Sequence, residues 1–107
     1  MFNKKNTMGQ KIKVIEPSQE IWFEVTKEFE VELENGTRIL YRVTENNKYS
    51  EEDYLVKPKG ADDYVNHWGY AYEGEDSDEI SEIAEKLLSA YYDGALDYEG
   101  DEVDLEE

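Results

Sequence analysis

Carboxylates are the residues through which this chain could do chemistry. Its 107 residues include 28 Asp and Glu but one histidine, His67, and no cysteine. Without cysteine there is no disulfide, no thiolate metal ligand and no cysteine nucleophile. A Ser–His–Asp arrangement is formally possible, but the sequence lacks a Gly-x-Ser-x-Gly elbow to present the serine. We therefore expect no enzymatic activity and assign no catalytic residue.

Carboxylates can also bind metal ions, and residues 93–102 are rich in oxygen ligands. Their order does not match the D-x-[DN]-x-[DN]-G pattern of an EF-hand loop. Weak binding of divalent cations is expected of any such acidic segment. We predict neither a specific metal site nor a cofactor.

The charge is large and unevenly distributed. The formal net charge is −17, and residues 1–72 hold 13 acids against 10 bases, whereas residues 73–107 hold 15 acids and one base, Lys86. A surface of this sign repels nucleic acid and anionic membranes. The charge favours a basic protein, a cation, or a basic groove that normally holds nucleic acid.

A helix is predicted to position the first part of this acidic region. Apolar residues recur at helical spacing, which indicates one buried face over residues 77–93: Ile80, Ile83, Ala84, Leu87, Leu88 and Tyr91. Asp76 or Ser77 can cap its start, and Gly94 can end it.

The preceding residues are typical of strands. Residues 28–34 and 37–44 alternate apolar and polar side chains around Asn35-Gly36. A two-residue loop would mix charged and apolar residues on both faces. We therefore predict a three-residue loop, 34–36, with Gly36 in a bulge, which pairs Phe29 with Tyr41 and Glu28 with Arg42.

Shorter strands are predicted at residues 11–15, stopped by Pro17, at 53–57 before Pro58, and at 67–72. The last of these would place Trp68, Tyr70 and Tyr72 on one face. Residues 20–26 fit either a strand or a short helix. Residues 57–63 are expected to form a loop.

These elements predict an α+β fold: a small antiparallel sheet of three to five strands, packed by one amphipathic helix in the C-terminal half. Ile80, Ile83, Leu87 and Leu88 should pack on Phe29, Val31, Ile39 and Tyr41. We expect a flexible N-terminus at 1–10, one domain at 11–94 and an acidic C-terminal segment at 95–107. Its anchors would be Leu96, Tyr98, Val103 and Leu105. No apolar run has the length of a membrane span or signal peptide, which predicts a cytoplasmic protein.

The acidic region offers a linear charge density comparable to that of duplex DNA, which carries one charge per ~1.7 Å. We hypothesise that it binds a basic groove, with tyrosines adding rigid contact area. The predicted partner-binding residues are Asp76, Asp78, Glu79, Glu82, Tyr92, Asp93, Asp97, Tyr98, Glu99, Asp101, Glu102 and Asp104.

The chain resembles phage-encoded DNA-mimic inhibitors, and among these it is most similar to the small type II-A anti-CRISPR proteins. The resemblance lies in a small antiparallel sheet, a helix over 78–92 and the segment Asp-Tyr-Glu-Gly-Asp-Glu at 97–102. The resemblance spans residues 28–104 in architecture and composition. It implies a host-cytoplasm inhibitor that blocks the cleft through which Cas9 reads the PAM. Alternatives are an anti-restriction or DNA-repair inhibitor, an acidic adaptor or chaperone-like partner of a basic protein, and a calcium-binding or enzymatic domain. A solvated helix face with a disordered acidic tail is the alternative without a binding role.

Overall fold

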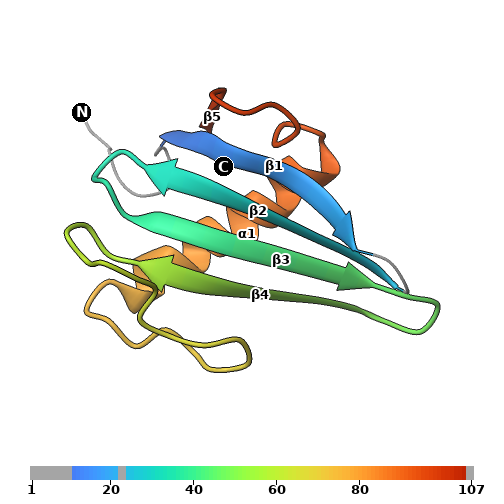
Figure 1. The fold of residues 1–107 in the computed structure, drawn as a ribbon, viewed down its shortest axis with the longest axis horizontal. Coiled ribbons are helices and arrows are strands. Elements are labelled where there is room, and N and C mark those ends of the chain that lie inside the picture. Colours follow the sequence, from blue (N-terminus) through green and yellow to red (C-terminus); the bar gives the residue numbers. More distant parts are fainter. Residues whose placement is uncertain (1–10, 22–23, 106–107) are drawn as a thin grey trace.

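The computed structural model describes residues 11–21 and 24–105. They form an antiparallel five-stranded sheet in the order β4-β3-β2-β1-β5 (Figure 1). The elements are β1 (Lys11–Ile21), β2 (Val25–Leu33), β3 (Arg38–Glu45), β4 (Ser50–Lys57), α1 (Ser77–Tyr92) and β5 (Glu102–Asp104). The predicted α+β class is confirmed.

The β2–β3 hairpin has the predicted register. Phe29 lies opposite Tyr41 and Glu28 opposite Arg42. The Leu33 N–H donates to the Thr37 carbonyl at 2.8 Å, which leaves residues 34–36 as the loop. Gly36 has a φ of 95°, a left-handed conformation that glycine adopts without steric cost. The three-residue loop is therefore confirmed.

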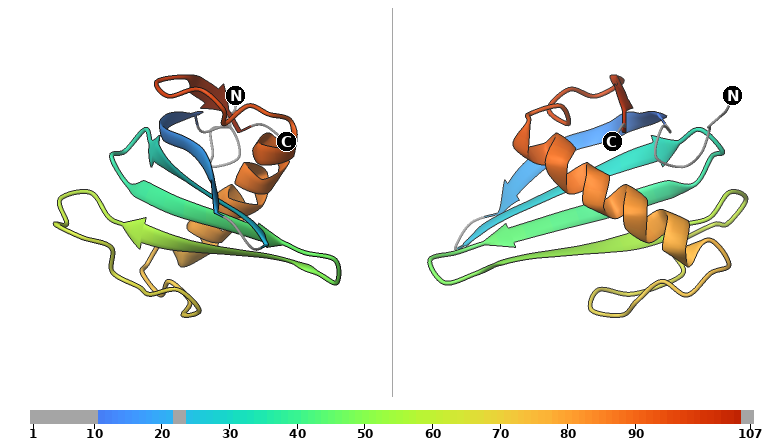
Figure 2. Two further views of the ribbon diagram at one scale, coloured as in Figure 1. Left: turned by 45° about the vertical axis from the view of Figure 1, so that its right-hand side comes forward. Right: turned by 180° about the vertical axis from the view of Figure 1, so that it is seen from behind.

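α1 crosses one face of the sheet (Figure 2). The predicted apolar stripe forms the core with that face, because Ile80, Ile83 and Leu87 are buried against Phe29 and Tyr41. Leu88 is half-buried at the edge of this core. We call the opposite side of the sheet the outer face.

The predicted caps of α1 are absent at its start, whereas the predicted glycine stop is present at its end. Asp76 is the N-cap residue, but neither predicted cap forms, because no cap side chain hydrogen-bonds to the first turn. At the other end the Ala95 N–H donates to the Ala90 carbonyl and the Gly94 N–H to the Tyr91 carbonyl. With Gly94 at φ 78°, this is the Schellman arrangement that glycine favours.

The prediction that Pro17 stops the first strand is wrong. β1 continues to Ile21 because its pairing with β2 shifts register between Val14 and Glu16 and again between Glu16 and Gln19. Pro17 lies in the second irregularity, where its missing N–H removes no ladder hydrogen bond. The segment 20–26, for which a strand or a short helix was expected, contains the end of β1 at Ile21 and the start of β2 at Val25. Residues 22 and 23 lie outside the described residues, as do 1–10, for which flexibility was predicted.

The strand predicted at 53–57 is confirmed within the longer β4, but the strand predicted at 67–72 is wrong. The chain bends at Gly69, where φ is 84° and the Tyr70 N–H donates to the His67 carbonyl. The aromatic alternation has another origin. Trp68 packs on Arg42 of the outer face, whereas Tyr72 reaches the core on the α1 side.

Residues 95–105 pack onto the sheet and α1. Leu96 and Leu105 are buried in the core, and Val103 is half-buried against it. β5 pairs with the start of β1, placing Ile12 opposite Val103. Tyr98, predicted as a further anchor, is instead exposed. Within the described part of the chain, no helix has the length and apolar character needed to cross a bilayer.

Candidate functional site

The structure distributes the predicted partner-binding residues over three places. The amino-terminal group, at the start of α1, is Asp76, Asp78, Glu79 and Glu82. The carboxyl-terminal group, at the end of α1 and in the loop that follows, is Tyr92, Asp93, Asp97, Tyr98, Glu99 and Asp101. The β5 pair is Glu102 and Asp104.

The carboxyl-terminal group is held by backbone and apolar contacts while its side chains face solvent. Leu96 is buried beside Asp97. The Gly100 N–H donates to the Val14 carbonyl at 2.8 Å, and the Val14 N–H donates to the Asp101 carbonyl at 2.9 Å. The loop is thereby attached to β1 at Gly100 and Asp101, and the backbone that carries its carboxylates has a defined position.

The β5 pair faces away from α1. Val103 lies on the core side, and successive strand side chains point to opposite faces, so Glu102 and Asp104 lie on the outer face. There they stand opposite Lys13 and Lys11 in the register. The Lys11 Nζ is 4.0 Å from Glu102 Oε1, and both side chains are largely exposed. These two acids therefore do not extend the acidic surface of α1.

The amino-terminal group lies in the first turns of α1. Asp78 and Glu79 occupy the first turn, where the helix dipole favours negative charge. The Asp76 carboxylate accepts a hydrogen bond from the Tyr72 hydroxyl. This group and the carboxyl-terminal group are separated by the helix, about 24 Å for its 16 residues.

Tyrosine hydroxyls hold several carboxylates, which the sequence reasoning missed. Among the described residues, four tyrosine–carboxylate hydrogen bonds are present: Tyr41 to Glu52, Tyr64 to Glu30, Tyr72 to Asp76 and Tyr92 to Glu45. The Tyr41 bond is 2.9 Å long and the Tyr92 bond 2.6 Å. The partners are 4, 11, 34 and 47 residues apart in sequence, so no common spacing indicates them.

These contacts raise the pKa of each tyrosine. Burial and then the Glu52 carboxylate raise the pKa of Tyr41, and burial and then Glu30 do so for Tyr64. For Tyr72, burial followed by the Asp76 hydrogen bond raises the pKa to about 12. The hydrogen bond to Glu45 is the main cause of the raised pKa of Tyr92. The tyrosines stay neutral near neutral pH, so they position carboxylates without cancelling their charge.

Cations neutralise few of these acids. Ion pairs join Lys11 to Glu102, Arg38 to Glu32 and Arg42 to Glu28 within residues 11–21 and 24–105, at 3.9 to 4.0 Å. All are partly exposed, and such pairs contribute little to stability. All three lie on the outer face, and none of the three involves a residue of α1.

Among the described residues, His67 belongs to no group of side chains placed to hold a metal ion. His67 is exposed in the loop of residues 58–76 that connects β4 to α1. The described residues contain no group of three or more His, Asp or Glu side chains placed to hold a metal ion. No protein-family model, curated protein or solved structure matches the chain. The resemblance to anti-CRISPR proteins stays a prediction.

Proposed function

We propose that the protein is a non-catalytic inhibitor that presents a DNA-mimicking acidic surface to a basic nucleic-acid-binding groove. The surface consists of the exposed acids of α1 and the carboxyl-terminal group. Within this class, we propose that the protein is a counter-defence protein of a phage or mobile element. It would act on Cas9 in the host cytoplasm. Restriction and DNA-repair enzymes offer grooves of the same chemistry.

The observation that carries the proposal is the attachment of the acidic loop 97–101 to the fold. The hydrogen bonds between Val14 and the residues at 100 and 101, together with buried Leu96, order a loop whose side chains stay exposed. A flexible polyanion must lose conformational entropy when it binds, whereas the backbone that carries these carboxylates is already ordered. They can therefore compete with DNA, which is itself stiff.

The dimensions of the surface support the same function. α1 extends about 24 Å, and the acidic loop continues from its end. The acidic side chains of α1 include Asp78, Glu79, Glu82 and Glu85, and Lys86 is the only base of this helix. Duplex DNA presents charges along a similar length at ~1.7 Å intervals, so a groove of Lys and Arg side chains could accept either ligand.

The test replaces four acids of the carboxyl-terminal group with amides: Asp93→Asn, Asp97→Asn, Glu99→Gln and Asp101→Asn. The matched control removes the same charge elsewhere: Glu16→Gln, Glu34→Gln, Asp62→Asn and Glu73→Gln, all exposed. Binding to a type II-A Cas9–guide RNA complex is measured by interferometry, and displacement of a PAM-bearing duplex by fluorescence anisotropy. Wild type and control should displace the duplex, and the test variant should not.

The proposal covers grooves other than that of Cas9, so each protein is also used to capture partners from nuclease-treated host lysate. A captured nucleic-acid-binding protein should be released by added duplex DNA. A ternary complex with DNA in a gel-shift assay would refute mimicry and support the adaptor alternative. Equal binding by the test and control variants would show that the acidic loop is not the interface.

A further inference from the structure

We propose that the open half of the β4 edge binds an extended, lysine- or arginine-bearing peptide, which adds to the sheet as a further strand. This site is separate from the acidic surface of α1 and does not depend on the function proposed above. β4 is the last strand on its side of the sheet, so one row of its backbone groups points away from β3.

The outward-pointing groups of β4 belong to alternate residues. Val56 identifies this row, because its N–H donates to the Asn66 side chain and its carbonyl accepts from the Val65 N–H, both at 2.9 Å. The Tyr54 carbonyl accepts from the Asn66 amide at 3.1 Å. Counting back by two places the N–H and carbonyl of Glu52 in the same row.

The loop 58–76 covers only half of this edge. Val65 and Asn66 use the edge groups at positions 54 and 56. Among the described residues, no hydrogen bond from outside the sheet reaches the N–H or carbonyl of Glu52. The edge at residues 50–53 is therefore open to a strand that the chain does not itself provide.

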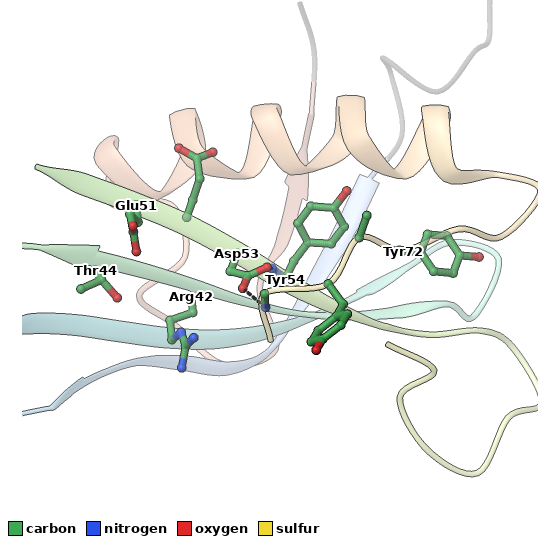
Figure 3. Close-up of a pocket in the computed structure, with 10 residues that line it drawn as sticks. Arg42, Thr44, Glu51, Asp53, Tyr54 and Tyr72 are labelled. Carbon is green, nitrogen blue, oxygen red and sulfur yellow. Dashed lines mark hydrogen bonds between the residues drawn. The ribbon is translucent and has the colours of Figure 1, made fainter. Parts of the chain in front are cut away.

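A cavity of about 510 Å³ lies beside this open stretch (Figure 3). It is lined by carboxylates of β4 and by tyrosines of both β4 and the loop 58–76: Glu51, Glu52, Asp53, Tyr54, Tyr70 and Tyr72. Carboxylates with aromatic rings form favourable surroundings for lysine and arginine heads, which gain both ionic and cation–π contacts. Tyr70 is 71% exposed, so its ring is accessible to a ligand.

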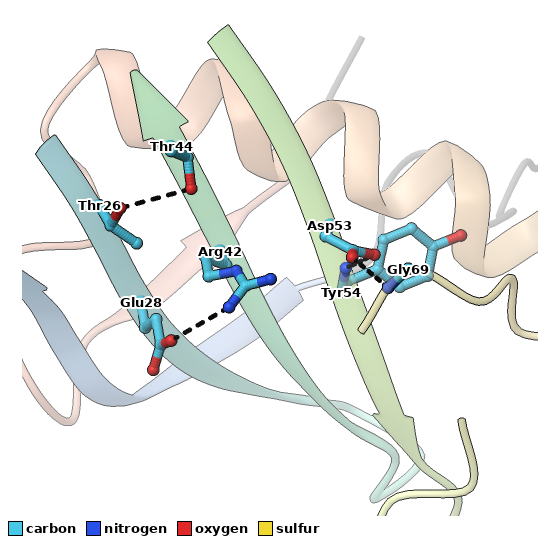
Figure 4. A network of polar contacts seen from close by, with 7 residues as sticks. All are labelled: Thr26, Glu28, Arg42, Thr44, Asp53, Tyr54 and Gly69. Atoms are coloured by element: carbon cyan, nitrogen blue, oxygen red, sulfur yellow. Dashed lines mark hydrogen bonds and ion pairs between the residues drawn. The ribbon is translucent and has the colours of Figure 1, made fainter. Parts of the chain in front are cut away.

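The one cation in the lining, Arg42, is already engaged by the protein. Its Nη1 lies 4.0 Å from Glu28 Oε2, and its guanidinium stacks 3.9 Å from the centroid of the Trp68 ring. Asp53 is its neighbour on β4, and Asp53 accepts the Gly69 N–H at 2.7 Å (Figure 4). Arg42 thus holds the loop in place, and the cavity keeps the negative character of its carboxylates.

Charge selects among the possible occupants. Nucleic acid is repelled by the three acids at positions 51–53. A second copy of this chain, paired through the same edge, would place those acids near their own equivalents, and like charges across strands are destabilising. An extended peptide with alternating cationic side chains satisfies the backbone groups and the carboxylates together.

The experiment uses the whole protein and the peptide acetyl-Thr-Lys-Val-Lys-Val-Lys-Thr-amide. Binding is followed by fluorescence anisotropy and by amide chemical shifts. We expect saturable binding, with the largest shifts at residues 50–53 and 69–72. A peptide of the same charge, N-methylated at alternate residues, should bind about tenfold more weakly because it loses backbone hydrogen bonds.

Two substitutions at position 52 distinguish the contribution of the backbone N–H to peptide binding from that of the side chain. Glu52→Pro and Glu52→Ala both remove the carboxylate that accepts the Tyr41 hydroxyl, but only proline removes the outward N–H. Glu52→Pro should bind the peptide more weakly than Glu52→Ala. Glu51→Gln, an exposed change, should weaken binding without affecting the fold.

Three results would overturn the proposal: no saturable binding, equal binding of the N-methylated peptide, or shifts confined to α1 and the 93–101 loop. If Glu52→Pro does not fold, the comparison of the two peptides on wild-type protein still shows whether binding depends on backbone hydrogen bonds.

Discussion

Tyr41 donates its hydroxyl hydrogen to Glu52 across β3 and β4, and three other tyrosines make equivalent contacts to Glu30, Asp76 and Glu45. A lysine in each place would pair with the carboxylate and cancel its charge. A phenol provides one hydrogen bond and remains neutral up to its pKa, near 10 in a free side chain. At the scale of single residues, this pairing explains how a chain with few bases holds four of its acids in place.

These tyrosines predict a loss of stability in alkali. Their pKa values are raised in the fold, so the unfolded chain ionises first, near pH ~10. The stabilisation is therefore complete below that pH and is lost as the pH rises through the folded pKa, about 12 for Tyr72. Denaturant unfolding at a series of pH values should show a free energy of unfolding that declines above pH ~10.

Tyr41→Phe supplies the control. The variant should lose about 1–2 kcal/mol at neutral pH, because the Glu52 carboxylate loses its donor. Its stability should then decline less steeply in alkali than that of the wild type. Equal declines would mean that Tyr41 does not contribute to the pH dependence.

At the scale of the elements, the apolar stripe of α1 and one face of the sheet form the core together. Leu87 is fully buried, and its neighbour Leu88 is only half-buried. Leu87→Ala should lower the free energy of unfolding by about 2–5 kcal/mol, through lost burial and the cavity left behind. Leu88→Ala should lower the free energy of unfolding by a smaller amount. A loss below about 1 kcal/mol for Leu87→Ala in denaturant melts would contradict the assignment of this stripe to the core.

The elements that the sequence predicts correctly are those with a strong local period. The hairpin register follows from alternation on both strands together with Gly36, and α1 follows from a regular apolar stripe ended by Gly94. Both signals come from residues close in sequence, where backbone geometry and side-chain direction are coupled.

Errors arise where distant parts of the chain decide the local structure. Pro17 is accommodated because β2 tolerates a shift in register, which depends on its partner strand. The aromatic alternation at 67–72 reflects two separate packing partners, Arg42 and the core. β5 has three residues, too few for a periodic signal, and it forms by pairing with β1.

The candidate site was predictable only in part. Composition located the acidic region, and α1 placed its first acids on an exposed face. The strand β5 turns Glu102 and Asp104 to the outer face, which charge counting could not indicate. Three of the four tyrosine donors lie 11 to 47 residues from the carboxylates that they contact, so these pairs become visible only in three dimensions.

At the scale of the whole molecule, a net charge of −17 opposes compaction through self-repulsion. Salt screens this repulsion, with a Debye length near 10 Å at about 0.1 M. The free energy of unfolding should therefore increase with sodium chloride concentration from low ionic strength. The variant that neutralises Asp93, Asp97, Glu99 and Asp101 should be more stable in low salt and respond less to added salt. A wild-type stability that falls with salt would mean that ion pairs dominate over repulsion.

The position of β5 in the sheet also has a kinetic consequence. Lys11 pairs with Asp104, so the chain must close a loop of most of its length before this edge can form. Contacts between such distant residues form late, because the entropy of loop closure has to be overcome first. The β1–β4 meander can assemble from neighbouring segments during synthesis, whereas β5 must wait until residue 104 has left the ribosome. The 97–101 loop is hydrogen-bonded to Val14 of β1, so we expect this loop to reach its final position at the same late stage as β5.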